Sequence, residues 1–235
     1  MRNVYLSDDY DFIGLSETWL SPNINTSELG LSGYSTYRCD RNQITSNRSR
    51  GGGVLLSINN KFHSRLLPVP TIPVEHVLVI IKINNNYIII GNVYFPSDIV
   101  IYNAHFDIIN SLLLSFPYVK NVLLVGDYNL PKLQWHATSI GFFPNMLNLN
   151  NLESEFLSKL SFLNLSQFNN VHNSIGSLLD LVLSDLNNLS VNKSVNPLIP
   201  CDIYHPGLLI YIPIVISEPI KYNFCMYNFF NCNYA

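Results

Sequence analysis

An apolar run that breaks into Gly-Asp-Tyr-Asn is the feature that most constrains the fold of this chain. The segment Val122–Pro131 reads Val-Leu-Leu-Val-Gly-Asp-Tyr-Asn-Leu-Pro. Such a run predicts a strand buried in the middle of a sheet, with a carboxylate and a carboxamide at its end. If the extended geometry continues, Asp127 and Asn129 point to one side, as expected where catalytic groups gather. An ordinary turn also explains these residues, and taken alone it is the better explanation.

The composition indicates one domain. The chain has 235 residues, 48% of them hydrophobic, which is enough for one sizeable core. We expect a domain over residues 1–218 and a tail of unknown structure over residues 219–235. The charged fraction is 12% and the net charge is -3, which excludes a chain-wide basic field for nucleic acid. Six of the 13 Lys and Arg residues fall between Arg38 and Arg65. They could form a local phosphate-facing patch, and a solvated loop explains them almost as well.

The sequence predicts an intracellular protein without a membrane span. Its four cysteines lack the paired spacing of a metal site, which favours a reduced compartment. They are Cys39, Cys201, Cys225 and Cys232. The first residues lack the apolar core of a secretory signal. The apolar stretch Leu208–Ile216 is broken by Pro213 and is far shorter than the roughly 20 residues that cross a bilayer.

Runs rich in Val, Ile and Leu predict seven strands. They are Phe12–Ser16, Gly53–Ile58, Val77–Ile83, Tyr87–Tyr94, Val122–Val125, Leu178–Ser184 and Leu208–Ile216. The third and fourth flank the turn residues Asn84–Asn86, which predicts an antiparallel hairpin. Asn150 precedes Glu153 at capping-box spacing, and a helical repeat follows to Leu163. A weaker helical pattern covers Tyr102–Leu114.

Other polar residues also end or interrupt apolar runs. Glu17 follows the first predicted strand, Tyr94 closes the fourth, Asp180 lies inside the sixth, and Asp202 and His205 precede the seventh. A carboxylate buried without a partner is costly, so Asp180 needs one, and an imidazole would serve. Singly, each residue has an ordinary explanation: Glu17 could cap a turn, Tyr94 could be a core aromatic, and His205 could lie in a solvated loop.

Six short motifs, in this order, resemble the endonuclease/exonuclease/phosphatase superfamily. They are Ser-Glu-Thr-Trp (16–19), Gly-Gly-Gly-Val (51–54), Asn-Val-Tyr-x-Pro (92–96), Gly-Asp-Tyr-Asn (126–129), Leu-Asp-Leu-Val-Leu-Ser (179–184) and Asp-x-x-His-Pro (202–206). Over residues 11–216 the chain is most similar to the apurinic/apyrimidinic-type endonuclease domain that precedes the reverse transcriptase in non-LTR retrotransposons. Trp135 after Gly-Asp-Tyr-Asn-Leu-Pro adds to this resemblance. The resemblance implies a deoxyribonuclease-I-like, four-layer α/β sandwich of two mixed, mostly antiparallel sheets face to face, with outer helices.

The resemblance also implies a metal site and an activated water. Glu17 would bind Mg²⁺, or Mn²⁺ in its place, because hard carboxylate oxygens suit these ions. Asp202 would be a second carboxylate on the metal side. Asp127 would orient or deprotonate the attacking water, and Asn129 would donate a hydrogen bond to the phosphate or to that water.

The remaining roles concern the phosphate. His205 resembles the histidine that closes the family sequence, and Asp180 the carboxylate that fixes its ring and favours its charged form. Tyr94 would contact the scissile phosphate. The implied reaction is phosphodiester hydrolysis, in which metal, imidazolium and amide donors neutralise charge developing on phosphate oxygens.

Two departures from the family pattern stand out. The family usually ends in Ser-Asp-His in direct succession, whereas Ile203 and Tyr204 separate Asp202 from His205 here. Family members also open with an asparagine-bearing strand well upstream of the glutamate, and Asn3 lies too close to Glu17 to be that asparagine. We therefore expect an N-terminally truncated domain.

Three functional hypotheses stay open. The first is a Mg²⁺-dependent endonuclease that binds the DNA backbone, acts in the nucleus, nicks target DNA for retrotransposition and was once fused to a reverse transcriptase. The second is a decayed or repurposed relic without turnover. The third is a phosphatase or sphingomyelinase of the same superfamily, since a fold alone does not choose the substrate. The sequence does not indicate an oligomeric state.

Overall fold

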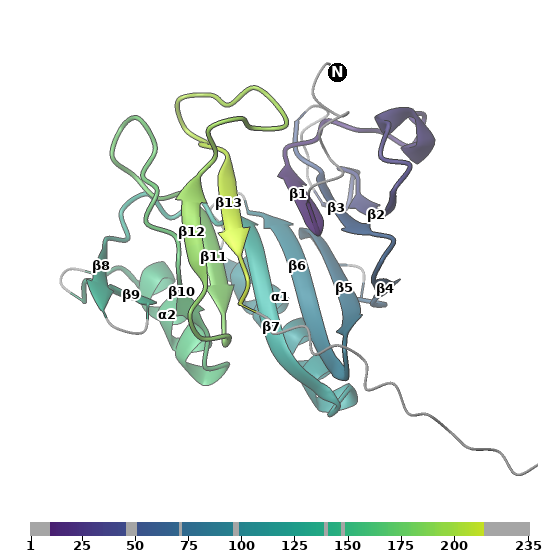
Figure 1. Ribbon diagram of the computed structural model, residues 1–235. Helices are drawn as coiled ribbons and strands as arrows, with labels where there is room; N and C mark the ends of the chain where they lie inside the picture. The colour runs from purple at the N-terminus through teal and green to yellow at the C-terminus, as the bar shows by residue number, and fades with distance from the viewer. Residues whose placement is uncertain are drawn as a thin grey trace, which may run out of the picture.

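The computed structural model describes residues 10–45, 51–70, 72–95, 99–138, 141–146 and 149–213, which form an α/β sandwich (Figure 1). The largest sheet has eight strands in the order β4-β5-β6-β7-β11-β10-β9-β8. In that order the strands are His63–Leu66, Glu75–Ile83, Asn86–Tyr94, Val119–Asp127, Asp180–Ser184, Ser166–Gln167, Gly141–Pro144 and Trp135–Thr138. Neighbouring strands are antiparallel except for the parallel pair β6–β7, so the sheet is mixed.

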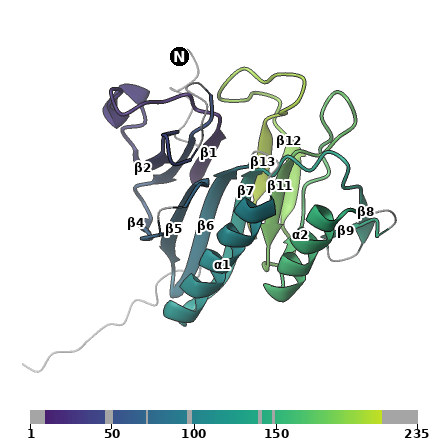
Figure 2. The same cartoon turned by 180° about the vertical axis from the view of Figure 1, so that it is seen from behind.

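Two smaller sheets pack on one face of the large sheet, and the α-helices α1 and α2 cover the other (Figure 2). The first small sheet has the order β1-β3-β2, and the second pairs β12 with β13. Their strands are β1 (Phe12–Ser16), β2 (Tyr34–Cys39), β3 (Val54–Asn59), β12 (Ser190–Lys193) and β13 (Leu208–Tyr211). The helices are η2 (Thr26–Leu29), a 3-10 helix, and the α-helices α1 (Ile99–Ser115) and α2 (Asn151–Phe162). The predicted sandwich is confirmed, and both described α-helices lie on one outer side.

The core has two parts because the central strands are buried on both faces. Along β6, Ile89 and Val93 pack in the cluster beneath the helices, while Ile88 and Ile90 pack against β3 of the first small sheet. Side chains alternate along a strand, so a strand covered on both faces reads as a continuous apolar run. The buried Asn92 links two layers, because its Nδ2 donates to carbonyl oxygens of β1 and β3 at 2.9 Å each.

All seven predicted strands are present with adjusted bounds, as are both helices. The hairpin β5–β6 turns through Asn84, whose φ of 55° is left-handed, and the Asn150 capping box is formed. The sequence did not predict β2, β4, β8, β9, β10 and β12, which are short or rich in polar residues. Asn3, residues 214–216 of the last predicted strand and the tail 219–235 lie outside the described residues. In the described part of the chain, no helix has both the length and the apolarity needed to cross a membrane.

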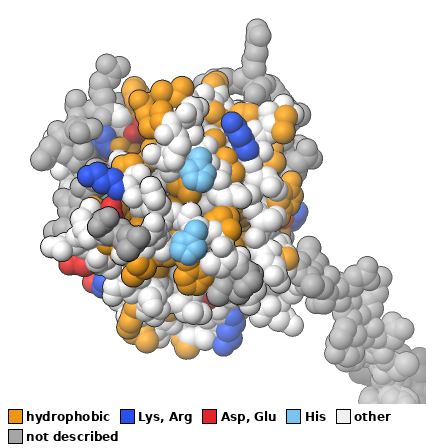
Figure 3. All heavy atoms as spheres, turned by 90° about the vertical axis from the view of Figure 1, so that its left-hand side faces the viewer, with side chains coloured by type: hydrophobic (Ala, Val, Ile, Leu, Met, Phe, Trp, Pro, Cys, Tyr) orange, Lys and Arg blue, Asp and Glu red, His pale blue; other side chains and the backbone are white. Residues whose placement is uncertain are grey.

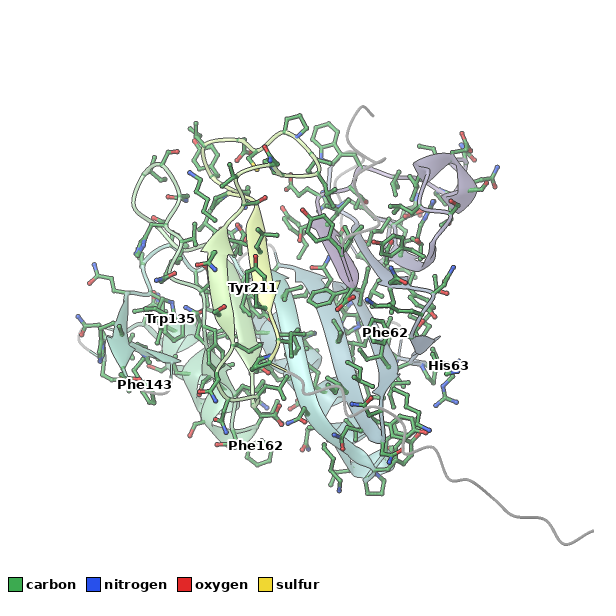
Figure 4. All side chains as sticks on the ribbon, viewed as in Figure 1. Phe62, His63, Trp135, Phe143, Phe162 and Tyr211 are labelled. Atoms are coloured by element: carbon green, nitrogen blue, oxygen red, sulfur yellow. The ribbon has the colours of Figure 1, made fainter. Side chains whose placement is uncertain are left out.

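The β8–β9 end of the large sheet carries little charge. Trp135 and Phe143 project from these strands (Figure 4). The side of the molecule that includes them shows hydrophobic, neutral polar and histidine side chains with few charged ones (Figure 3).

Candidate active site

Strand register brings three of the sequence-predicted site residues into one row. Asp127 lies opposite Asp180 in the antiparallel pair β7–β11, and Tyr94 lies beside Asp127 in the parallel pair β6–β7. Residues in register on neighbouring strands point to the same face of a sheet, with the strands about 5 Å apart. Tyr94 belongs to the core cluster on the face of the small sheets, so both carboxylates point there as well.

His205 completes this row from the loop between β12 and β13, which lies over the same ends of the strands (Figure 1). Its Nδ1 lies 3.0 Å from Oδ2 of Asp180, the contact that the sequence predicts. Its Nε2 lies 4.0 Å from Oδ2 of Asp127. The imidazole is therefore bracketed by two carboxylates, and the ligand atoms of all three residues lie within 4.8 Å of one another.

This geometry raises the pKa values of both Asp127 and His205, so the pH range in which Asp127 is anionic while His205 is charged moves upward. Burial, followed by the charge of Asp180, raises the pKa of Asp127 to about 7. The hydrogen bond to Asp180 raises the pKa of His205 to about 9, against the opposing effect of burial. Between pH 7 and 9 the site thus combines a carboxylate that can accept a proton with a charged imidazolium.

The turn after β7 fixes the Asp127 carboxylate. Gly126 has φ 134°, and a Cβ at this position would collide with the carbonyl oxygen of Val93 on β6. Asn129 has φ 49°, and its backbone N–H donates to Oδ1 of Asp127 at 2.9 Å. The extended geometry that would place Asp127 and Asn129 on one side does not continue to Asn129, because β7 ends at Asp127 and this local hydrogen bond favours the alternative, a turn. Tyr128, fully buried between them, anchors the turn in the core.

Glu17 lies in a second strained turn at the mouth of the same site. Both Glu17 and Trp19 are left-handed, with φ 51° and 55°, and the turn is hydrogen-bonded from Thr18 N to Gly53 O (3.1 Å) and from Trp19 N to Gly52 O (2.9 Å). Backbone strain of this kind persists only where surrounding contacts hold it, and it concentrates at functional sites.

Glu17 also reaches the other site residues. Its carboxylate accepts a hydrogen bond from the Tyr94 hydroxyl. Burial and then this bond raise the pKa of Tyr94 to about 12. The charge of Glu17 adds to the rise in the pKa of Asp127. The structure therefore brings Glu17, Tyr94, Asp127, Asp180 and His205 together.

Asp202 has a local contact instead. It is exposed, and its Oδ1 accepts from the backbone N–H groups of Tyr204 and His205 at 2.7 Å each. It therefore shapes the loop that carries His205, and its negative charge also raises the pKa of that histidine. Its role on the metal side stays a prediction.

The site offers two sets of groups to a divalent ion. Asp127, Asp180 and His205 offer three converging ligand atoms. Mg²⁺ prefers oxygen ligands, and the hydrogen bond to Asp180 keeps His205 protonated at neutral pH, so this set is better suited to holding protons. The exposed Glu17 carboxylate, beside the Tyr94 hydroxyl, is a hard oxygen donor with solvent access and fits an ion that keeps several waters.

The sequence reasoning missed an ion pair of the site region, Arg41 with Glu75. Arg38 and Arg41, expected in a phosphate-facing patch or a solvated loop, instead form ion pairs with Asp40 and Glu75, and all four side chains are at most 13% exposed. Arg41 and Glu75 lie beside Tyr94 and the Glu17 turn. No sequence signal connects them, because they are 34 positions apart.

Comparison with known proteins identifies the fold. No family model matches the sequence, and no curated protein matches it. Solved structures do match. The endonuclease domain of TRAS1, a telomere-specific non-LTR retrotransposon, is similar with TM-score 0.58 and 13% identity, over 89% of this chain and 88% of the domain. An AP endonuclease from Archaeoglobus fulgidus has TM-score 0.54 and 13% identity, over 90% and 93%. The human Nocturnin catalytic domain has TM-score 0.53 and 14% identity, over 87% and 80%.

These structures show the fold of the chain. The chain has the fold of the endonuclease/exonuclease/phosphatase superfamily, as its motifs predicted.

Proposed function

We propose that this chain is a Mg²⁺-dependent phosphodiesterase, specifically an endonuclease that nicks target DNA for retrotransposition. The observation that carries the proposal is the pairing of Asp127, with its pKa raised to about 7, and His205, with its pKa raised to about 9, in one row at the ends of β7 and β11. Phosphodiester hydrolysis needs a proton acceptor for water and a positive group for the phosphate, and these two residues supply both near pH 8.

The remaining residues take complementary roles in this proposal. Glu17, with Asp202 as a second carboxylate, would hold Mg²⁺ or Mn²⁺, and the bound ion supplies positive charge to the phosphate. Asp127 accepts the proton of the attacking water, and Asn129 donates a hydrogen bond to that water or to the phosphate. Tyr94 contacts the scissile phosphate.

The choice of DNA rests on likeness. The similar structures include the endonuclease domain of a non-LTR retrotransposon and an AP endonuclease, whose names state that activity. We extend the proposal to a single domain over residues 1–218, a nuclear site of action and a former fusion to a reverse transcriptase. The strained backbone at Glu17 and Asn129 favours a working site over a decayed relic, because such strain is costly to keep.

The test is nicking of supercoiled plasmid with Mg²⁺ and with excess chelator. We expect open-circular DNA from the native chain with Mg²⁺ only, and loss of this product in the Asp127→Asn and His205→Gln variants. Asp185→Asn is the matched control. Asp185 is a partly buried carboxylate that accepts from Val122 N at the opposite end of β7. Equal nicking by the native chain and Asp127→Asn would refute the proposal, and a folded native chain without nicking would favour the relic.

A further inference from the structure

We propose that the buried pair Arg41–Glu75 is a positioning device that holds Glu17 and Tyr94 in their working geometry. The inference rests on the proposed function. The pair bridges the end of β2 to the start of β5, with Arg41 Nε 2.6 Å from Glu75 Oε1 and Nη2 3.3 Å from Oε2. The side chains are 10% and 2% exposed. Burying such a pair costs desolvation that the attraction barely offsets, so stability alone is a weak reason to keep it.

The Glu75 carboxylate supports the turn that carries Glu17. Its Oε2 accepts from Gly53 N at 2.7 Å, within the buried interior. The carbonyl oxygen of the same Gly53 accepts from Thr18 N, the residue directly after Glu17. One charged group therefore connects through a single residue, Gly53, to the strained turn. Thr45 Oγ1 also donates to Glu75 at 3.3 Å, so the carboxylate has several directed contacts.

The glycines leave room for the arginine. Gly52 has φ 67°, and a Cβ there would collide with the Arg41 guanidinium. Gly53 has φ 82°, and a Cβ there would lie 2.8 Å from Thr18 Oγ1. The Gly-Gly-Gly motif thus acts together with Arg41. The backbone of the glycine motif packs against the Arg41 guanidinium, and its carbonyl oxygens accept hydrogen bonds from the Glu17 turn.

The Arg41 guanidinium supports Tyr94. Its central carbon lies 5.6 Å from the centre of the Tyr94 ring, and it donates a hydrogen bond to the hydroxyl group. The Tyr94 hydroxyl in turn donates to Glu17. Tyr94 also lies opposite Glu75 in the β5–β6 register. The route through Gly53 therefore ends at the backbone of the Glu17 turn, and the route through Tyr94 ends at the Glu17 carboxylate.

The consequence is a specific effect on metal binding. An apolar pair of equal size would fill the space but would provide neither the fixed acceptor for Gly53 nor the donor for Tyr94. Groups that orient a metal ligand typically change metal affinity about 10–100-fold when they are replaced. We expect an effect of this size from Arg41 and Glu75, although neither side chain touches the ion.

The experiment measures Mn²⁺ binding by calorimetry without DNA, alongside thermal unfolding. Glu75→Gln keeps the shape and leaves Arg41 without its counter-charge. Arg41→Lys keeps the charge and loses the planar fork. We expect both variants to weaken Mn²⁺ binding at least about tenfold, with the larger loss for Glu75→Gln. The matched control is Arg38→Met with Asp40→Asn. In this second, partly buried pair, Arg38 instead donates to the carbonyl oxygens of Ser21 and Ile24.

The outcomes separate this inference from the proposed function. The control should lose stability and keep its Mn²⁺ affinity. Folded Arg41→Lys protein with native Mn²⁺ affinity overturns the positioning role, even where Glu75→Gln does not fold. Glu17→Gln tests the proposed site itself. If the native protein and the Glu17→Gln variant bind Mn²⁺ equally well, the proposed metal site is contradicted. If Glu17→Gln loses Mn²⁺ affinity and Arg41→Lys does not, only the positioning role of the ion pair is contradicted.

Discussion

Asp127 and Asp180 face each other in the β7–β11 ladder, whereas Glu17 lies in a turn with left-handed backbone angles. Backbone hydrogen bonds to Gly52 and Gly53 hold this turn. The first region is positioned by strand register, which is cooperative and shared with the core. The second is positioned by a few directed polar contacts that end in a buried ion pair. Changes in the first region should therefore act on proton transfer, and changes in the second should act on the metal.

The largest effect is expected at Asp127. Asp127→Asn should lower nicking by about 10²–10⁴-fold, because the proton acceptor is lost. The same change should stabilise the fold above pH 7. Because the pKa of Asp127 is raised in the folded protein, the free energy of unfolding falls as pH rises from 3.8 towards 7. An amide at this position does not ionise and avoids this fall. We expect a gain on the order of 1–2 kcal/mol in urea unfolding at pH 8. Lower stability of the variant at pH 8 would contradict the buried-carboxylate explanation.

The next effect concerns the pairing of Asp180 with His205. Asp180→Asn should lower the pKa of His205 towards its ordinary value and lower nicking near pH 8. In the native protein the raised pKa contributes stability that is complete below about pH 6.5 and is lost as pH rises through about 9. NMR titration of the His205 ring checks this. An identical His205 pKa in both proteins rules out the contact.

A smaller effect is expected at Glu17. Glu17→Gln should raise the Mg²⁺ concentration for half-maximal nicking at least about tenfold. Binding of DNA in chelator should change little, since the exposed carboxylate is not a phosphate contact. Gel-shift and Mg²⁺ titration measure the two quantities. If Glu17→Gln needed the same Mg²⁺ concentration as the native protein, the assignment of metal binding to the Glu17 region would be wrong.

The smallest effect tests the distinction from outside the site. Replacing the pair Arg38–Asp40 by Met and Asn should change nicking less than twofold, while it lowers thermal stability. Arg38 donates hydrogen bonds to the loop carbonyl oxygens of Ser21 and Ile24, and these contacts do not involve the site residues. A loss of Mg²⁺ affinity equal to that of Glu75→Gln would mean that general loosening, and not the Gly53–Glu17 connection, sets the metal site.

The same difference between the two regions explains what the sequence could predict. The apolar runs marked β6, β7 and β11, so the residues at their ends, Tyr94, Asp127 and Asp180, were found as candidates. The need of Asp180 for a partner indicated an imidazole, and the family resemblance implied that it is His205. The Arg41–Glu75 pair was missed, because charged residues in a polar segment suggest a surface and no periodicity connects positions 41 and 75.

Turn chemistry caused the other failure. Asp127 and Asn129 would point to one side only if the extended geometry continued, but the competing hydrogen bond from the Asn129 backbone to Asp127 produces a left-handed turn. Short strands such as β8, β9 and β10 were missed because they contain too few residues for a pattern, and their pairing partners fix them.

The most direct test is the pH–rate profile of Mg²⁺-dependent plasmid nicking by the native chain from pH 5 to 10. The site predicts a rate that rises through about pH 7, as Asp127 becomes anionic, and falls above about pH 9, as His205 loses its proton. Asp180→Asn should move the falling limb to lower pH and leave nicking dependent on Mg²⁺. A rate that is constant across this range, or nicking that persists in excess chelator, would contradict a hydrolytic site built on Asp127 and His205.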